Sequence, residues 1–192
     1  IGETTCDGKK KTWEILDEYV PTYVMELPQR KEAADLDLWA GEIKRLKGEI
    51  ERRSGQEITP EKLAAGIRKA NARRAALARL YRARQADPAP ISGKDALLIS
   101  QLAFFDDPDR FTARVNALCD ELEERIARGE GVTGKGALRL LVTGTLMALP
   151  YWKLHHLVET SGAVIVAEET CTGTRYFAGT VAEDGQTLDE QI

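Results

Sequence analysis

The sequence predicts an α/β fold, in which two parallel-sheet lobes, both incomplete in this chain, are joined by a mainly helical middle segment. Three observations support this prediction. A loop, a helix and a short strand fill the start of the chain, helical periodicity follows, and a strand–helix–strand pattern comes after a glycine-rich linker. The expected divisions are 1–30 for the end of an N-terminal lobe, 31–130 for the helical segment and 131–192 for the start of a C-terminal lobe.

The first 30 residues predict the last loop, helix and strand of an α/β lobe. After the Asp7-Gly8 turn, apolar residues at intervals of three and four predict a short helix that Pro21 ends: Trp13, Leu16 and Val20. The following "TYVMEL" predicts a strand that stops at Pro28. Because the chain starts with Ile1 directly inside this pattern, we expect it to be an internal piece of a longer polypeptide.

The middle segment predicts one helix after another. The first of them carries a narrow apolar seam suited to packing against an antiparallel helix, at Leu36, Trp39, Ile43, Leu46 and Ile50. Capping residues, or proline at the first helical position, predict three further helix starts: Thr59-Pro60, Ser92 with Asp95, and Asp107-Pro108. Gly129 is expected to end the last helix.

The C-terminal lobe is predicted from two apolar runs. "LRLLVTG" and "AVIVAEE" predict buried strands, and "YWKLHHLVETSG" predicts the helix between them. A βαβ unit of this length gives a parallel sheet with a right-handed crossover, so we expect Rossmann-like lobes. Ligands bind at the carboxyl ends of strands in such sheets. The turns after Thr143 and Glu169 are therefore the expected places for a site.

Composition excludes several classes of protein. With 27 basic and 31 acidic residues the net charge is -4, which disfavours nucleic acid as a partner of the whole protein. No run approaches the roughly 18 apolar residues of a membrane helix, so no membrane association is expected. The three cysteines lack the spacing of a disulfide framework, which favours a reducing, cytoplasmic compartment.

The cysteines differ in their local sequence. Cys6 lies near a helix start and before Lys9, Lys10 and Lys11, all of which favour thiolate, the form that binds soft metals; a buried thiol and a nucleophile stay open as alternatives. The lysine run fits either a solvated face or an anionic neighbour. Cys171, in a glycine-containing loop after a buried strand, could equally pack or bind a ligand, whereas mid-helix Cys119 is expected to pack.

Other polar features favour ordinary structural roles. His155 and His156 are adjacent in a predicted helix, so one imidazole is expected to pack and the other to be exposed. Residues 62–86 contain eight basic residues and no acidic one. We expect this face to be solvated or paired within the chain, with "DELEE" at 120–124 as a candidate partner. A non-catalytic α/β module whose basic helical arm binds a partner or nucleic acid is the alternative function.

Three segments resemble a known family. "GETTCDGKKK" at 2–11, "VMELP" at 24–28 and "GAVIVAEETCTGTRYF" at 162–177 resemble the iron-sulfur subunits of the 2-hydroxyacyl-CoA dehydratase and benzoyl-CoA reductase family, which includes the 2-hydroxyglutaryl-CoA dehydratase D-component. The resemblance covers essentially the whole chain. It implies that Cys6 is a ligand of an iron-sulfur cluster and that Cys171 is a second one, as is typical of the double-cubane branch. Thr145 stands where many relatives have cysteine.

The resemblance also implies a function. By this resemblance, the cofactor of the protein would be a 4Fe-4S cluster or a double-cubane 8Fe-9S cluster. Its partners would be an ATP-hydrolysing iron-sulfur activator protein and a homologous subunit, with which it would form a homo- or heterodimer. A low-potential electron from the activator would turn an acyl-CoA thioester into a ketyl radical that loses its hydroxyl group as water. In the double-cubane branch, the activity would be an ATP-dependent reduction of small molecules. No catalytic acid or base is assigned.

Overall fold

The computed structural model describes residues 1–147, 151–185 and 187–191 of the chain. It is a mixed α/β structure with two small parallel sheets, as the sequence predicts. The chain divides into two compact units, one of residues 1–64 with 184–192 and the other of residues 65–183. The division into lobes at residues 30 and 130 stays a prediction.

The first unit contains the helix and the strand expected at the start of the chain, preceded by a short strand that the sequence did not predict. Strand β1 (Gly2–Glu3) pairs in parallel with β2 (Val24–Met25), and α1 (Asp7–Asp17) connects them. The α1 residue Trp13 packs on Gly2, where an added Cβ would lie 2.6 Å from the indole, and its Nε1 donates to Glu3 O at 2.8 Å. Trp13 therefore fixes α1 against the sheet.

The rest of the first unit is helical. Helix α2 (Ala33–Ser54) ends where Gly55 adopts φ 67°, and the short α8 is Leu188–Gln191. Two residues of the α2 apolar seam, Leu36 and Ile50, are exposed. The expected packing of this seam against an antiparallel helix is thus not complete within the described residues.

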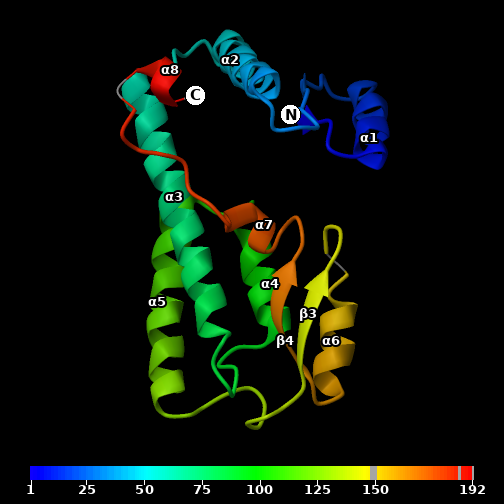
Figure 1. The fold of residues 1–192 in the computed structure, drawn as a ribbon, viewed down its shortest axis with the longest axis vertical. Coiled ribbons are helices and arrows are strands. Elements are labelled where there is room, and N and C mark those ends of the chain that lie inside the picture. Colours follow the sequence, from blue (N-terminus) through cyan, green and yellow to red (C-terminus); the bar gives the residue numbers. More distant parts are fainter. Residues whose placement is uncertain (148–150, 186, 192) are drawn as a thin grey trace. The chain divides into compact units, whose positions relative to one another are not determined.

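The second unit is built on three helices, the first of which begins at Pro60 in the first unit, and all three starts follow the predicted signals. Helices α3 (Pro60–Ala83), α4 (Gly93–Leu102) and α5 (Pro108–Ala127) begin at proline or after a capping residue. Ser92 Oγ accepts from Asp95 N at 3.0 Å, and Asp107 Oδ1 accepts from Arg110 N at 2.9 Å. Helices α3 and α5 lie side by side (Figure 1) around a core that includes Leu77, Leu80, Phe111, Val115, Cys119 and Leu122.

The second parallel sheet lies beside these helices. Strand β3 (Arg139–Thr143), α6 (Lys153–Thr160) and β4 (Val164–Glu169) form the predicted βαβ unit, and α7 (Thr174–Phe177) follows. In the described structure, β4 is the only strand that pairs with β3.

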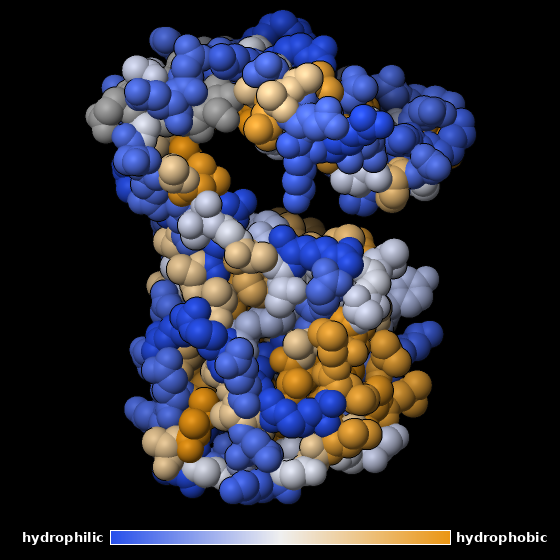
Figure 2. All heavy atoms as spheres, viewed as in Figure 1, coloured by the Kyte–Doolittle hydropathy of each residue, from blue (hydrophilic) through white to orange (hydrophobic). Residues whose placement is uncertain are grey.

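Strand β4 is buried as predicted, but the expectation of a buried β3 is wrong. Ile165 in β4 is 0% exposed, whereas Leu141 in β3 is 61% exposed. The reason is that α4, α6 and α7 pack on β4, whereas the main contact of β3 among the described elements is β4 itself. Figure 2 shows an apolar surface over β3 and α6, to which Leu138, Leu141, Leu154 and Leu157 contribute.

The basic face of α3 is paired within the chain. Arg79 Nη2 lies 2.7 Å from carboxylate oxygens of both Asp120 and Glu123, which belong to the acidic stretch named above. Lys69 pairs with Asp109 at 2.5 Å. The prediction of internal pairing is therefore confirmed for these two cations. Among the described residues, none of the helices has the length and apolar character that crossing a bilayer requires.

Candidate functional site

Cys6 caps the first helix. It lies three residues after the end of β1 and is the N-cap residue of α1, with extended backbone angles of φ -143° and ψ 154°. Its carbonyl accepts from Lys10 N at 3.0 Å, while its thiol is exposed and makes no side-chain cap bond. The thiol thus lies at the positive end of an 11-residue helix, where an anion is favoured.

The three lysines after Cys6 pair with nearby carboxylates. Lys9 lies 2.8 Å from Glu3, Lys10 lies 3.4 Å from Asp7, and Lys11 lies 2.6 Å from Glu14. These side chains are largely exposed. Of the two interpretations of the lysine run, these contacts favour a solvated, paired face.

A cavity opens at the carboxyl ends of β1 and β2. It has a volume of about 430 Å³ and is lined by Thr4, Lys10, Val24, Glu26, Leu27, Gln29 and Arg45. Leu27 N donates to Thr4 Oγ1 at 2.8 Å, which joins the ends of the two strands. Glu42, 1% exposed, accepts from Glu26 N at 3.3 Å and pairs with Arg45. The cavity is where an α/β sheet binds ligands.

The second candidate cysteine lies at the matching place of the other sheet. We call residues 170–173, between β4 and α7, the Cys171 loop. Cys171 is exposed, whereas Thr170 and Thr172 on either side are buried. Gly173 N donates to Thr170 O at 3.0 Å. A Cβ on Gly173 would lie 2.1 Å from Glu168 O, so only glycine fits this turn.

An ion pair lies next to the Cys171 loop. Arg175 Nη2 donates to Glu169 Oε2 at 2.6 Å, and Thr143 Oγ1, at the end of β3, donates to the same oxygen at 2.8 Å. The hydrogen bonds from Arg175 and then Thr143 lower the pKa of Glu169 to about 2. Glu169 and the neighbouring Cys171 raise the pKa of Arg175. A guanidinium cation therefore stands beside the thiol.

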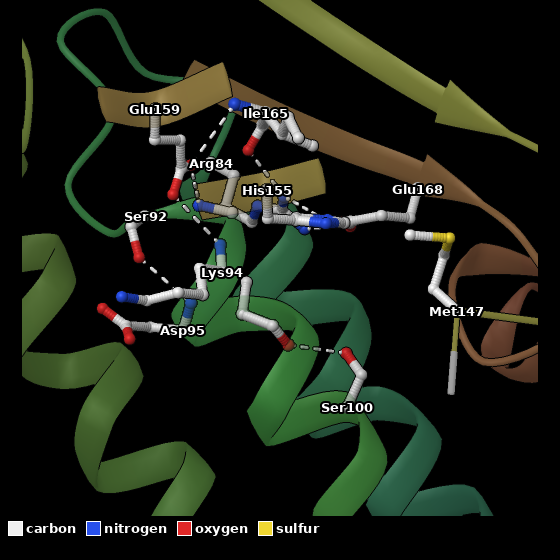
Figure 3. Close-up of polar contacts among 12 residues, drawn as sticks. Arg84, Ser92, Lys94, Asp95, Ser100, Met147, His155, Glu159, Ile165 and Glu168 are labelled. Atoms are coloured by element: carbon white, nitrogen blue, oxygen red, sulfur yellow. Dashed lines mark hydrogen bonds and ion pairs between the residues drawn. The ribbon is translucent and has the colours of Figure 1, made fainter. Parts of the chain in front are cut away.

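A buried polar network lies behind the loop, and sequence reasoning missed it. Glu168 is 0% exposed, and its carboxylate accepts from Tyr81 Oη at 2.6 Å, from Arg84 Nη1 at 2.6 Å and Nη2 at 3.0 Å, and contacts His155 Nε2 at 3.0 Å. Figure 3 shows Arg84 and His155 pointing toward Glu168. The sequence did contain a signal for this network, because Glu168 lies inside a strand expected to be buried and a buried carboxylate needs a charged or hydrogen-bonding partner.

The network keeps Glu168 ionised. Burial raises the pKa of Glu168, but hydrogen bonds from His155 and Arg84 outweigh it and lower the pKa to about 2. Because an ionised carboxylate only accepts hydrogen bonds, His155 Nε2 carries the proton of this contact. His155 is buried and His156 is exposed, which confirms the prediction for this pair.

The structure treats the three cysteines differently. Cys119 is 0% exposed in the α3–α5 core, which confirms its packing role, and burial raises its pKa. Cys6 belongs to the first unit and Cys171 to the second. Within the described parts of the chain, no group of three or more His, Cys, Asp or Glu side chains could hold a metal ion. The ligand roles of Cys6 and Cys171 stay predictions.

Comparison with known proteins shows the family of the chain. Residues 1–191 match the family described as 2-hydroxyglutaryl-CoA dehydratase, D-component. The chain is also 37% identical, over 195 residues, to an Escherichia coli (strain K12) protein named "Putative dehydratase subunit YjiM". That alignment covers 98% of this chain and 49% of the relative, so the chain spans about half the relative's length. The chain therefore belongs to the 2-hydroxyglutaryl-CoA dehydratase D-component family.

Proposed function

We propose that this chain is part of the iron-sulfur subunit of a 2-hydroxyacyl-CoA dehydratase, in which Cys6 and Cys171 are cluster ligands. One observation supports this most strongly. In a chain of a dehydratase family, each of these cysteines is exposed in a loop that follows a parallel strand and precedes a helix. Loops at this edge of a parallel sheet are the usual place for ligands and cofactors.

The chemistry of the two loops fits an iron-sulfur cluster. Thiolates are the protein ligands of such clusters, and both thiols lie beside positive charge, from the start of α1 at Cys6 and from Arg175 at Cys171. The buried hydroxyls of Thr170 and Thr172 have no hydrogen-bond partner among the residues described. Hydroxyl donors next to cluster sulfur atoms would tune the reduction potential.

Two cysteines do not make a complete ligand set. A 4Fe-4S cluster takes four thiolates in its common form, and the described residues gather no larger donor group. We therefore place the remaining ligands in other parts of the full-length protein. As a dehydratase subunit, the chain would act with partner subunits, and we propose a homologous subunit and an ATP-hydrolysing activator protein.

The bound cluster would supply a low-potential electron to the acyl-CoA thioester. In the overall reaction, the 2-hydroxyl group and a proton from C3 leave as water, a C2–C3 double bond forms, and the electron is returned. The role of this chain's residues is to hold the cluster thiolates in place. The double-cubane reductase is the alternative, because Cys171 has the sequence context of that branch.

Metal content tests the ligand assignment. Full-length protein prepared without oxygen should contain iron and acid-labile sulfide, and Cys6→Ala and Cys171→Ala should each lose at least half of the iron. Cys119→Ala is the matched control, since this thiol lies in the α3–α5 core, and it should keep the iron. Equal iron in all three variants would refute the assignment.

Product analysis separates the two reactions. With activator, ATP and a reductant, a dehydratase converts a 2-hydroxyacyl-CoA into a 2-enoyl-CoA whose mass is smaller by one water. Reduction of a small molecule without loss of water from any acyl-CoA would instead support the double-cubane alternative.

A further inference from the structure

One side chain of α3 contacts the chain on both sides of the Cys171 loop. Tyr81 Oη donates to Glu168, two residues before the loop, and the Tyr81 ring packs edge-on against Phe177, four residues after it, with 4.7 Å between centroids. We propose that Tyr81 and Glu168 are positioning residues for Cys171. The inference rests on the proposed role of Cys171 as a cluster ligand.

The first step of the argument is that the Glu168 carboxylate cannot move freely. Its Oε2 accepts from Tyr81 and Arg84, and its Oε1 accepts from Arg84 and contacts His155. Tyr81 lies in α3, Arg84 directly follows α3, and His155 lies in α6. Arg84 Nη2 also donates to Ile165 O at 2.8 Å. Burial, followed by the charge of Glu168, raises the pKa of Tyr81, so its hydroxyl stays a donor.

The second step is that Glu168 supports the loop through its backbone. Its carbonyl accepts from Thr174 Oγ1 at 3.2 Å and lies directly against Gly173, with no room for a Cβ between them. Gly173 N in turn closes the loop on Thr170 O at 3.0 Å. A displacement of Glu168 must therefore displace Gly173, and with it the turn that presents Cys171.

The third step concerns the helix after the loop. Helix α7 has only four residues, too few to hold a helical conformation by itself. Its Phe177 is buried against Tyr81, both less than 10% exposed. Contact with α3 therefore also fixes the position of the end of the loop. The hydroxyl and the ring of Tyr81 act on opposite sides of the loop and can be tested separately.

A merely structural role is the competing explanation, in which the network only holds α3 against β4. Removing it would then loosen the whole second unit equally. If Tyr81 and Glu168 position Cys171, removing the network should instead affect only residues 170–176 and should change the electronic state of the cluster.

The test uses Tyr81→Phe in the full-length protein, with Tyr176→Phe as the matched control. Tyr81→Phe keeps the ring against Phe177 and removes one donor to Glu168, whereas Tyr176 packs on Phe104 at 4.6 Å between centroids. Hydrogen exchange is measured on protein freed of iron by a chelator. The Gly173 amide should exchange at least tenfold faster in Tyr81→Phe, β3 and α6 should stay unchanged, and the control should match the wild type.

The second measurement is the paramagnetic resonance spectrum of the reduced, iron-loaded protein. Tyr81→Phe should keep its iron but change the spectrum, and Tyr176→Phe should change neither. Unchanged exchange at Gly173, faster exchange across the whole second unit, or faster exchange with an unchanged spectrum each overturns the inference. A different result, full iron content in Cys171→Ala, would refute the proposed function. That result would not alter the outcome of the exchange experiment, which tests the positioning of the loop by itself.

Discussion

The two cysteine-bearing loops share a local pattern but differ in what supports them. Both follow a strand of a parallel sheet: "TCDG" at 5–8 includes the first two residues of α1, and "TCTG" at 170–173 lies between β4 and α7. Beside Cys6 the supporting ion pair is Lys9–Glu3, whose side chains are 41% and 28% exposed; behind Cys171 it is Arg84–Glu168, with both side chains 0% exposed. The same tetrapeptide frame is thus held by a solvated pair in one unit and by a buried network in the other.

Helix length explains this difference. Helix α1 has 11 residues and is held on its sheet by Trp13 from within the helix, so the backbone at Cys6 is fixed as an N-cap. Helix α7 has four residues and depends on tertiary contacts. A short helix after a strand therefore needs long-range partners to place its loop, and the partners of the Cys171 loop come from α3 and α6.

The largest effect is expected where the supporting pair is buried. Glu168→Gln leaves the Arg84 guanidinium buried without a counter-charge, and the free energy of unfolding of the second unit should fall by about 3–5 kcal/mol. Glu42→Gln in the first unit should change stability by less than about 1 kcal/mol, because its partner Arg45 is 63% exposed. Segment-resolved hydrogen exchange in denaturant measures both values.

The same pair gives a pH dependence with a definite sign. The pKa of Glu168 is lowered from 4.5 to about 2, so its contribution to stability is fully present above pH 4.5 and is lost as the pH falls toward 2. The wild-type second unit should lose stability through this window, and Glu168→Gln should lack that part of the loss. Identical acid profiles of the two proteins would contradict the buried pair.

The glycines of the two tetrapeptides give a third prediction. Gly173→Ala forces a Cβ against the Glu168 carbonyl and should destabilise the second unit by about 1–3 kcal/mol or more, because backbone lies on both sides of the contact. Gly8→Ala places its Cβ in open space within α1 and should stabilise the first unit by about 0.5–1 kcal/mol. Thermal unfolding of each unit, monitored by hydrogen exchange, distinguishes the effects of the two substitutions. Equal effects at the two glycines would remove the contrast between the loops.

Sequence reasoning succeeded where local rules decide the structure. The Thr59-Pro60 and Asp107-Pro108 signals predicted helix starts, and the "LRLLVTG" and "AVIVAEE" runs predicted parallel strands. It failed at the exposed face of β3, because an apolar run does not show whether a second layer covers it. It also missed the Arg84–Glu168 pair, because the two residues are 84 positions apart in the sequence and Arg84 belongs to a stretch with no acidic residue of its own.

The smallest effect is expected at the cap of α1. Cys6 has the backbone of an N-cap but makes no side-chain cap bond, and serine is among the preferred residues there. In iron-free protein, Cys6→Ser should stabilise α1 by about 0.5–1 kcal/mol, which slows exchange of its amides about two- to fivefold. Cys171→Ser should give no such gain, because Gly173 and not Cys171 precedes α7 as its N-cap. If both substitutions slowed exchange alike, or neither did, the result would contradict the statement that the N-cap of α1 supports the Cys6 loop and that the Cys171 loop lacks such support.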